Sequence, residues 1–153
     1  MAEQSIAQTL KINSSQLNAY SAGLLQGKAY RTLNAHLTRA LLEFDLSIPE
    51  WKLLGQLYDN GDMRLAQLAD QLNVEPPLVT ALVDSLEKKE FVLRKNDQKD
   101  KRAKVISSTE KSLHNIPEIE IKIKKTMAML LSGITREELI TYMKVLTAIV
   151  DNG

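Results

Sequence analysis

Basic side chains gather in one short part of the chain. Between residues 87 and 104, eight Lys and Arg residues stand against four Asp and Glu residues, although the whole chain carries a formal net charge of only +1. Ammonium and guanidinium groups at this density bind phosphate oxygens, so the chemistry they favour is binding to a nucleic-acid backbone. The alternative is a solvated charged loop that binds nothing.

Other kinds of chemistry find little support in the sequence. The chain has no Cys, which excludes disulfides, thiolate zinc sites and thiol redox sensing. It also lacks a Gly-rich phosphate loop and a recognisable Ser/His/acid arrangement. The two histidines, His36 and His114, lie far apart without the carboxylate spacing of a metal site. We therefore expect no enzyme, no cofactor and no metal.

The totals favour one compact unit inside the cell. A chain of 153 residues suffices for one domain. Its start, MAEQSIAQTLKI, lacks the basic and apolar regions of an export signal, and no apolar run approaches the ~18 residues of a membrane span. We expect a soluble, cytoplasmic protein that does not contact a membrane.

The first half of the chain shows helical spacing of apolar residues. Residues 15–44 run without Pro and predict a long helix. Ser47 and Glu50 have the spacing of a capping box, which predicts a second helix that ends at the DNGD turn of residues 59–62. Residues 63–72 predict a short third helix.

Residues 65–86 predict a helix-turn-helix. Ala69 is small where two helices would cross, and Asn73 tolerates the left-handed backbone that a tight turn requires. Two β-compatible runs follow, FVLRK and AKVIS, on either side of the polar segment NDQKDKR. This order is typical of a winged helix-turn-helix, the alternative being an ordinary helical hairpin in a core.

The second helix of this motif begins with two prolines. Proline is tolerated in a first turn because the amides there have no partner within the helix. We expect Pro77 at the first helical position and Pro76 at the cap, which would leave the amides of Leu78 and Val79 to meet a phosphate.

The last third of the chain predicts two further helices. The first starts at Ser108 or Thr109 and is expected to bend or break near Pro117. Gly133 ends it, and residues 135–138 form a second capping box before an amphipathic helix with Leu139, Met143, Leu146 and Val150 on one face.

Together these elements predict a mainly α fold, an α+β winged helix with additional terminal helices. Residues 47–108 form the winged helix-turn-helix. Residues 1–46 and 109–153 have no obvious core of their own, so we expect their apolar faces to pack against a second copy as a helical dimer domain.

Three segments resemble the MarR family of transcription regulators: LSIPEWKLLGQL, LADQLNVEPPLVTALVDSLEKK and DKRAKVISSTEKS. The resemblance covers roughly residues 20–150. It implies a homodimer whose helix at residues 76–89 enters the major groove of double-stranded DNA. It also implies that Arg102, oriented by Asp100, enters the minor groove, where a narrow groove attracts Arg.

This resemblance and the charge pattern give the expected DNA-binding residues. They are Arg64, Pro76, Pro77, Thr80, Ala81, Asp84, Ser85, Lys88, Lys95, Lys99, Lys101, Arg102 and Lys104. Many family members carry Arg in place of Ala81 and Ser85, and Gly in place of Glu90. We therefore expect the helix to discriminate weakly between sequences and the hairpin to supply most of the phosphate affinity.

Regulators of this family commonly bind small aromatic anions between the dimer helices and the winged domain. The hypothesis for this chain is a similar cleft bordered by Tyr30, His36 or Trp51, for a phenolic effector. Aromatic residues of this kind are otherwise core or interface residues.

The function predicted from the sequence is a homodimeric, ligand-responsive repressor that binds a pseudo-palindromic operator. The alternative is a dimeric protein–protein interaction module on the same fold, with weak, non-specific DNA binding.

Overall fold

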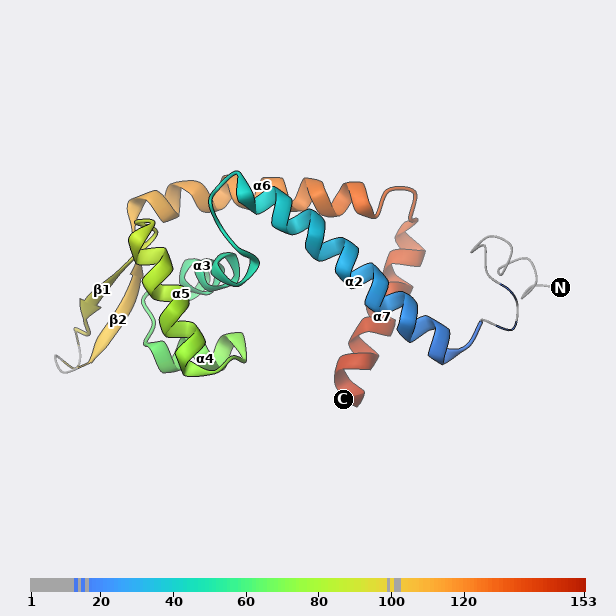
Figure 1. Cartoon of the computed structure of the whole chain (residues 1–153), viewed down its shortest axis with the longest axis horizontal. Helices are drawn as coiled ribbons and strands as arrows, with labels where there is room; N and C mark the ends of the chain where they lie inside the picture. The colour runs from blue at the N-terminus through green and yellow to red at the C-terminus, as the bar shows by residue number, and fades with distance from the viewer. Residues whose placement is uncertain (1–12, 14, 16, 99, 101–102) are drawn as a thin grey trace.

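The computed structural model describes residues 13, 15, 17–98, 100 and 103–153. The expected DNA contacts Lys99, Lys101 and Arg102 lie outside the described residues. The elements form an arc, with the short helices and the hairpin at one end and the long helices α2 and α6 leading away from them to α7 (Figure 1). In chain order the described elements are α2 (Ala19–Leu42), α3 (Ile48–Asn60), α4 (Leu65–Leu72), α5 (Pro76–Lys88), β1 (Val92–Asn96), β2 (Lys104–Ser108), α6 (Glu110–Leu130) and α7 (Arg136–Asn152).

Local capping determines where the helices begin. The side chain of Asn18 accepts a hydrogen bond from the Ser21 amide at 2.9 Å, so α2 starts at Ala19. The sequence had predicted a start at residue 15. The capping box predicted for Ser47 and Glu50 is confirmed. The box predicted at residues 135–138 is also confirmed, with Thr135 as the N-cap of α7.

The turn between α4 and α5 has the predicted backbone, and its prolines lie one position away from the prediction. Asn73 is left-handed, with φ 51° and ψ 51°. Glu75 is the N-cap of α5, so Pro76 and not Pro77 is the first helical residue. The amides of Leu78 and Val79 both donate to the Glu75 carbonyl, at 3.0 and 3.4 Å. We expected these amides to have no partner within the protein, and this expectation was wrong.

The two strands pair as an antiparallel hairpin with Arg94 opposite Ile106. Each lies one residue later than the apolar runs suggested. Met63, just before α4, forms an isolated bridge with Ile106, which joins the hairpin to the helix-turn-helix. Between α5 and β1 the chain turns at Glu90, whose φ of 62° is a conformation that glycine adopts at less cost.

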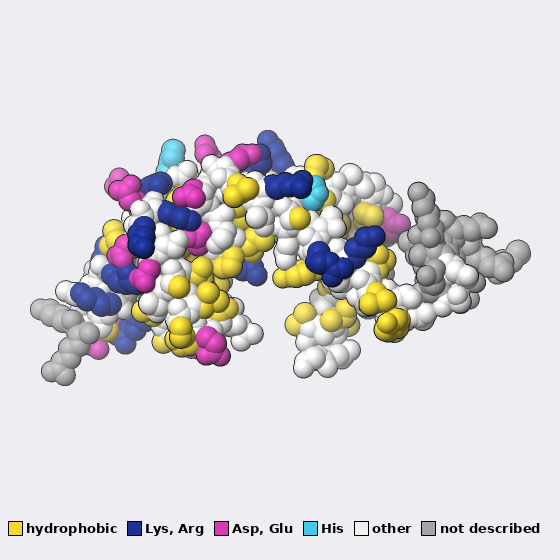
Figure 2. Space-filling model, in the orientation of Figure 1, with side chains coloured by type: hydrophobic (Ala, Val, Ile, Leu, Met, Phe, Trp, Pro, Cys, Tyr) yellow, Lys and Arg dark blue, Asp and Glu magenta, His cyan; other side chains and the backbone are white. Residues whose placement is uncertain are grey.

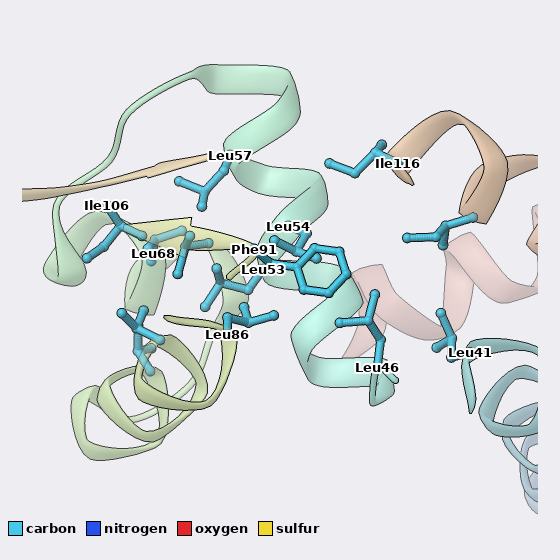
Figure 3. Close-up of a cluster of buried hydrophobic side chains, with 14 of the residues drawn as sticks. Leu41, Leu46, Leu53, Leu54, Leu57, Leu68, Leu86, Phe91, Ile106 and Ile116 are labelled. Atoms are coloured by element: carbon cyan, nitrogen blue, oxygen red, sulfur yellow. The ribbon is translucent and has the colours of Figure 1, made fainter. Parts of the chain in front are cut away.

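One hydrophobic core joins the winged part to the long helices (Figure 3). Leu53, Leu54 and Leu57 of α3 are at its centre and are almost fully buried. Leu41 comes from α2, and Ile116 from α6, so residues of both long helices pack on the winged part. The remaining core residues include Leu37, Ala40, Leu46, Leu68, Val79, Val83, Leu86, Phe91, Val92, Ile106, Ile119 and Ile123.

Helix α6 passes through Pro117 without interruption, where a bend or break was expected. In the sequence, Ile119, Ile121 and Ile123 alternate as they would in a strand. The helical spacing of Ile116, Ile119 and Ile123 prevails, because these three side chains all face the core. Helix α7 differs, since none of its residues is buried within the described part of the chain. Figure 2 shows apolar side chains on this helix and on the adjoining end of α2.

Candidate nucleic-acid interface

Helix α5 has one buried face and one exposed face. Val79, Val83 and Leu86 are fully buried and fix the helix on the core. The opposite face exposes Pro77, Thr80, Ala81, Asp84 and Lys88, which have helical spacing and form one continuous stripe. We call these five residues the reading stripe. The sequence predicted all of them as DNA contacts.

Two hydroxyl groups of α5 are already bonded inside the protein. The Thr80 hydroxyl donates to the Pro76 carbonyl at 3.2 Å. The Ser85 hydroxyl donates to a carboxylate oxygen of Glu50 at 2.6 Å, and Ser85 is only partly exposed. Ser85 was predicted to contact DNA, and the structure instead directs its hydroxyl group into the protein.

The acids of α5 are paired with an arginine from the hairpin. Arg94 of β1 forms ion pairs with both Asp84 and Glu87. The hydrogen bond that Arg94 donates to Asp84, together with the charges of both acids, raises the pKa of Arg94 above its ordinary value. An acidic helix would repel phosphate, and this arginine offsets that charge. In the sequence, Arg94 is one of the eight basic residues of the cluster at residues 87–104, and nothing there indicates its two acidic partners.

A buried carboxylate holds the end of α5 against the start of α3. Glu50 is 4% exposed, and Lys89 donates to its two oxygens at 2.9 and 3.1 Å. Burial raises the pKa of Glu50, but hydrogen bonds from Ser85, from the Ser47 amide and from Lys89 outweigh it, so the pKa lies below its ordinary value. The sequence identified Glu50 only as a capping residue.

The start of α6 also binds the C-terminal end of α5. Lys111 donates to the Lys89 carbonyl at 2.7 Å, and the Thr109 hydroxyl donates to the Glu90 carbonyl at 2.7 Å. These bonds satisfy carbonyl groups that a helix end leaves without a partner. The orientation of α5 is therefore determined by α3 on one side and α6 on the other.

The start of the hairpin loop, directly after β1, is held by Arg64, the N-cap residue of α4. Its guanidinium donates to Asp97 at 2.6 Å and lies 4.0 Å from Asp100. The hydrogen bond with Asp97 raises the pKa of Arg64. Lys95 is exposed, and Lys104 donates to Asn96 across the hairpin at 2.6 Å. Arg64 and Lys95 line one hollow beside the hairpin, and Lys104 lies on β2.

An apolar cavity of about 550 Å³ lies between the long helices and α5. Tyr30 and Trp51 border it, as the sequence suggested, whereas His36 is not among its lining residues. Among the described residues that line the cavity, Lys52 is the one that carries a charge. The full lining is Tyr30, Leu33, Asn34, Leu37, Ile48, Pro49, Trp51, Lys52, Leu72, Val74, Leu78, Leu82 and Met127.

Leu78 and Leu82 belong to α5 itself, so this cavity touches the helix that bears the reading stripe. Sequence spacing did not indicate Lys52, because several helices come together to form the cavity.

The described residues contain no cluster of His, Asp or Glu that could hold a metal ion. Within the same residues, none of the helices combines the length and hydropathy that crossing a membrane requires.

Comparison with known proteins identifies the winged part. Residues 46–104 match the model of the MarR family. The HTH-type transcriptional regulator MhqR of Bacillus subtilis (strain 168) is 32% identical over 90 residues, which are 59% of this chain. The match spans 62% of that relative's length.

Solved structures share the fold of nearly the whole chain. BpsR of Bordetella bronchiseptica, whose DNA binding is regulated by 6-hydroxynicotinic acid, superposes with a TM-score of 0.75 at 16% identity, covering 89% of this chain and 95% of its own. CouR of Rhodococcus jostii RHA1, solved with p-coumaroyl-CoA, gives 0.72 at 20% identity, covering 84% and 90%. MarR of E. coli in its apo form gives 0.70 at 20% identity, covering 83% and 95%. Residues 46–104 therefore match the MarR family in sequence, and nearly the whole chain shares the fold of these solved structures.

Proposed function

We propose that this protein is a DNA-binding transcription regulator that acts as a homodimer and as a ligand-responsive repressor. The observation that carries the proposal is the reading stripe of α5, which is exposed beside a hairpin rich in basic residues. A helix of this width fits the major groove, and the hairpin then reaches the neighbouring backbone and minor groove. Pairing of Asp84 and Glu87 with Arg94 supports this reading, because it offsets the acidity of α5.

The apolar surface of α7 supports the homodimer. Ile140, Met143, Val145, Ile149 and Val150 of this helix are each more than half exposed. Tyr20, Leu24 and Leu25 of α2 are exposed to a similar degree. Exposed apolar side chains in this number on two helices are typical of a protein interface, and a second copy of the chain would bury them.

The proposed effector is a small aromatic anion in the cavity between α2, α3, α5 and α6. Apolar walls would take an aromatic ring, and Lys52 would attract a carboxylate. Because Leu78 and Leu82 line the same cavity, an occupant would press on the helix that reads DNA. Two proteins of this fold support an effector of this class, since 6-hydroxynicotinic acid regulates DNA binding of BpsR and CouR was solved bound to p-coumaroyl-CoA.

Fluorescence anisotropy over a salt series tests the DNA proposal, with duplex DNA from the gene's own upstream region and a scrambled duplex. We expect tighter binding to the upstream DNA and, for Arg102→Ala, weaker binding with a salt slope shallower by ~1. Lys124→Ala removes an exposed charge from α6 and serves as the matched control. Equally weak binding of the wild type to both duplexes would refute the proposal and favour a protein–protein interaction module.

Sedimentation equilibrium tests the dimer. Ile149→Glu places a charge in the apolar surface of α7, and we expect it to shift the protein towards monomer. Lys144→Glu places the same carboxylate on the polar side of the same helix, in line with Glu137 and Asp151, and should leave the dimer intact. A monomeric wild type at micromolar concentration would contradict the proposal.

Fluorescence of Trp51, the one tryptophan in the sequence, tests the effector cavity. We expect 4-hydroxybenzoate or salicylate to change this emission and to weaken DNA binding. Lys52→Met retains the apolar walls and removes the cation, so it should reduce affinity for the anion. Unchanged emission and DNA affinity at millimolar concentrations of these acids would exclude phenolic acids as effectors.

A further inference from the structure

We infer that the reading stripe recognises operator DNA through the methyl groups of thymine and not through hydrogen bonds to base edges. The inference rests on the proposed DNA-binding function and specifies which bases the helix reads. It is carried by the chemical groups that the stripe leaves exposed.

The polar groups at the front of the stripe and beside it are already engaged. The Thr80 hydroxyl donates to the Pro76 carbonyl, and the methyl group of this exposed residue is its apolar part. Asp84 is paired with Arg94, and the neighbouring Ser85 hydroxyl is bonded to Glu50. Donating to a base from either hydroxyl, or accepting at the paired oxygen of Asp84, would first require a bond within the protein to be broken or shared.

The groups that remain exposed are apolar. Pro77 offers ring carbons, and Thr80 and Ala81 each offer a methyl group, all on one face of α5. The C5-methyl of thymine is the apolar group that base pairs present in the major groove. Apolar contact between Ala or Thr side chains and that methyl group is an established mode of base recognition.

Guanine is a poor match for the front of the stripe. Its major-groove edge presents two acceptors and requires a donor such as Arg or Lys. The first cationic residue on the stripe is Lys88, seven positions after Ala81 and so about 10 Å further along the helix axis. Lys88 would then lie over a phosphate or a more distant base. The front of the helix would face a thymine-rich segment of each half-site.

Selection from a random duplex library, followed by replacement of individual thymines with deoxyuridine, tests the inference. Deoxyuridine differs from thymidine only by the absent methyl group, so the base pair and its hydrogen-bonding edges are preserved. When a thymine within a selected half-site is replaced, we expect the affinity of the protein for the duplex to fall about fourfold per methyl group removed. Uracil placed in the flanking DNA outside the half-sites should have no effect.

Two substitutions at one exposed position localise the contact. Thr80→Ser removes the methyl group and keeps the hydroxyl, whereas Thr80→Val keeps a methyl group and removes the hydroxyl. We expect Thr80→Ser to bind thymine and uracil equally at one position of the half-site. Thr80→Val should retain the preference for thymine. Circular dichroism of both variants provides the folding control.

The outcomes separate this inference from the function on which it rests. Sequence-specific binding that does not change when uracil replaces thymine would overturn methyl recognition and leave the regulator proposal intact. The same conclusion would follow if this binding were lost in Thr80→Val and retained in Thr80→Ser. Failure of the selection to enrich any sequence would overturn both.

Discussion

The Lys89 ammonium lies 2.9 Å from one carboxylate oxygen of Glu50 and 3.1 Å from the other. The same ammonium donates to the Asp45 carbonyl at 2.7 Å. Glu50 belongs to the first turn of α3, and Lys89 is the C-cap of α5. Two residues separated by 39 positions thus fix the end of α5 on the core.

Glu50→Ala should lower the free energy of unfolding by about 3 kcal/mol, because it removes the partner of a largely buried cation. Lys89 is 25% exposed, which places the effect at the lower end of the range for buried ion pairs. Urea unfolding measures it. Glu50→Gln keeps the size and part of the hydrogen bonding, so its loss should be smaller; an equal loss would mean that the charge accounts for the whole effect.

The Glu50 network should also make stability depend on pH under acidic conditions. The folded-state pKa of Glu50 lies below its ordinary value of 4.5. Its contribution is therefore present above pH 4.5 and is lost as pH falls through the lower folded-state pKa. Thermal melts from about pH 6 to about pH 3 should show a smaller decline for Glu50→Gln than for the wild type.

A second acid must be separated from this effect. A backbone hydrogen bond from Thr135, and then the Thr135 hydroxyl, also lower the pKa of Glu138. Since Glu138 is present in both proteins, the difference between their melting curves isolates Glu50. Parallel curves would contradict the assignment.

The ion pairs of Arg94 predict that a second substitution, at Asp84, restores part of the DNA affinity that is lost when Arg94 is removed. Arg94→Ala should weaken DNA binding by roughly tenfold, or about 1.4 kcal/mol, because Asp84 and Glu87 would then face the phosphates without a counter-charge. The double variant Asp84→Asn, Arg94→Ala should recover part of this loss. No recovery in anisotropy titrations would instead indicate that Arg94 itself contacts DNA.

The ion pair of Arg64 and Asp97 leads to a prediction about whether DNA binding becomes stronger or weaker when Asp97 is replaced. Asp97→Asn removes a negative charge near the hairpin, which by charge alone should strengthen DNA binding. We expect weaker binding instead, because a neutral amide at this position would hold Arg64 and the start of the hairpin loop less firmly than the carboxylate does. Anisotropy titrations measure the change. Tighter binding would show that Arg64, once released, acts mainly as a phosphate contact.

Local signals in the sequence determined most of the secondary structure. The capping boxes of α3 and α7 depend on residues three positions apart, and the left-handed turn at Asn73 depends on one residue type. The hairpin and the exposed stripe of α5 followed from periodicity, because spacing within one element decides which side chains share a face. The family resemblance in the same segments indicated the fold.

The tertiary structure decided which of the predicted site residues are exposed for contact and which are engaged inside the protein. Ser85 and Thr80 have the same kind of hydroxyl group, yet one reaches Glu50 of α3 and the other its own helix. Arg94 meets Asp84 from a different element, and Lys52 completes a cavity formed with other helices while His36 lies outside it. Spacing along one element cannot predict such contacts, because they depend on how separate elements pack around a shared core.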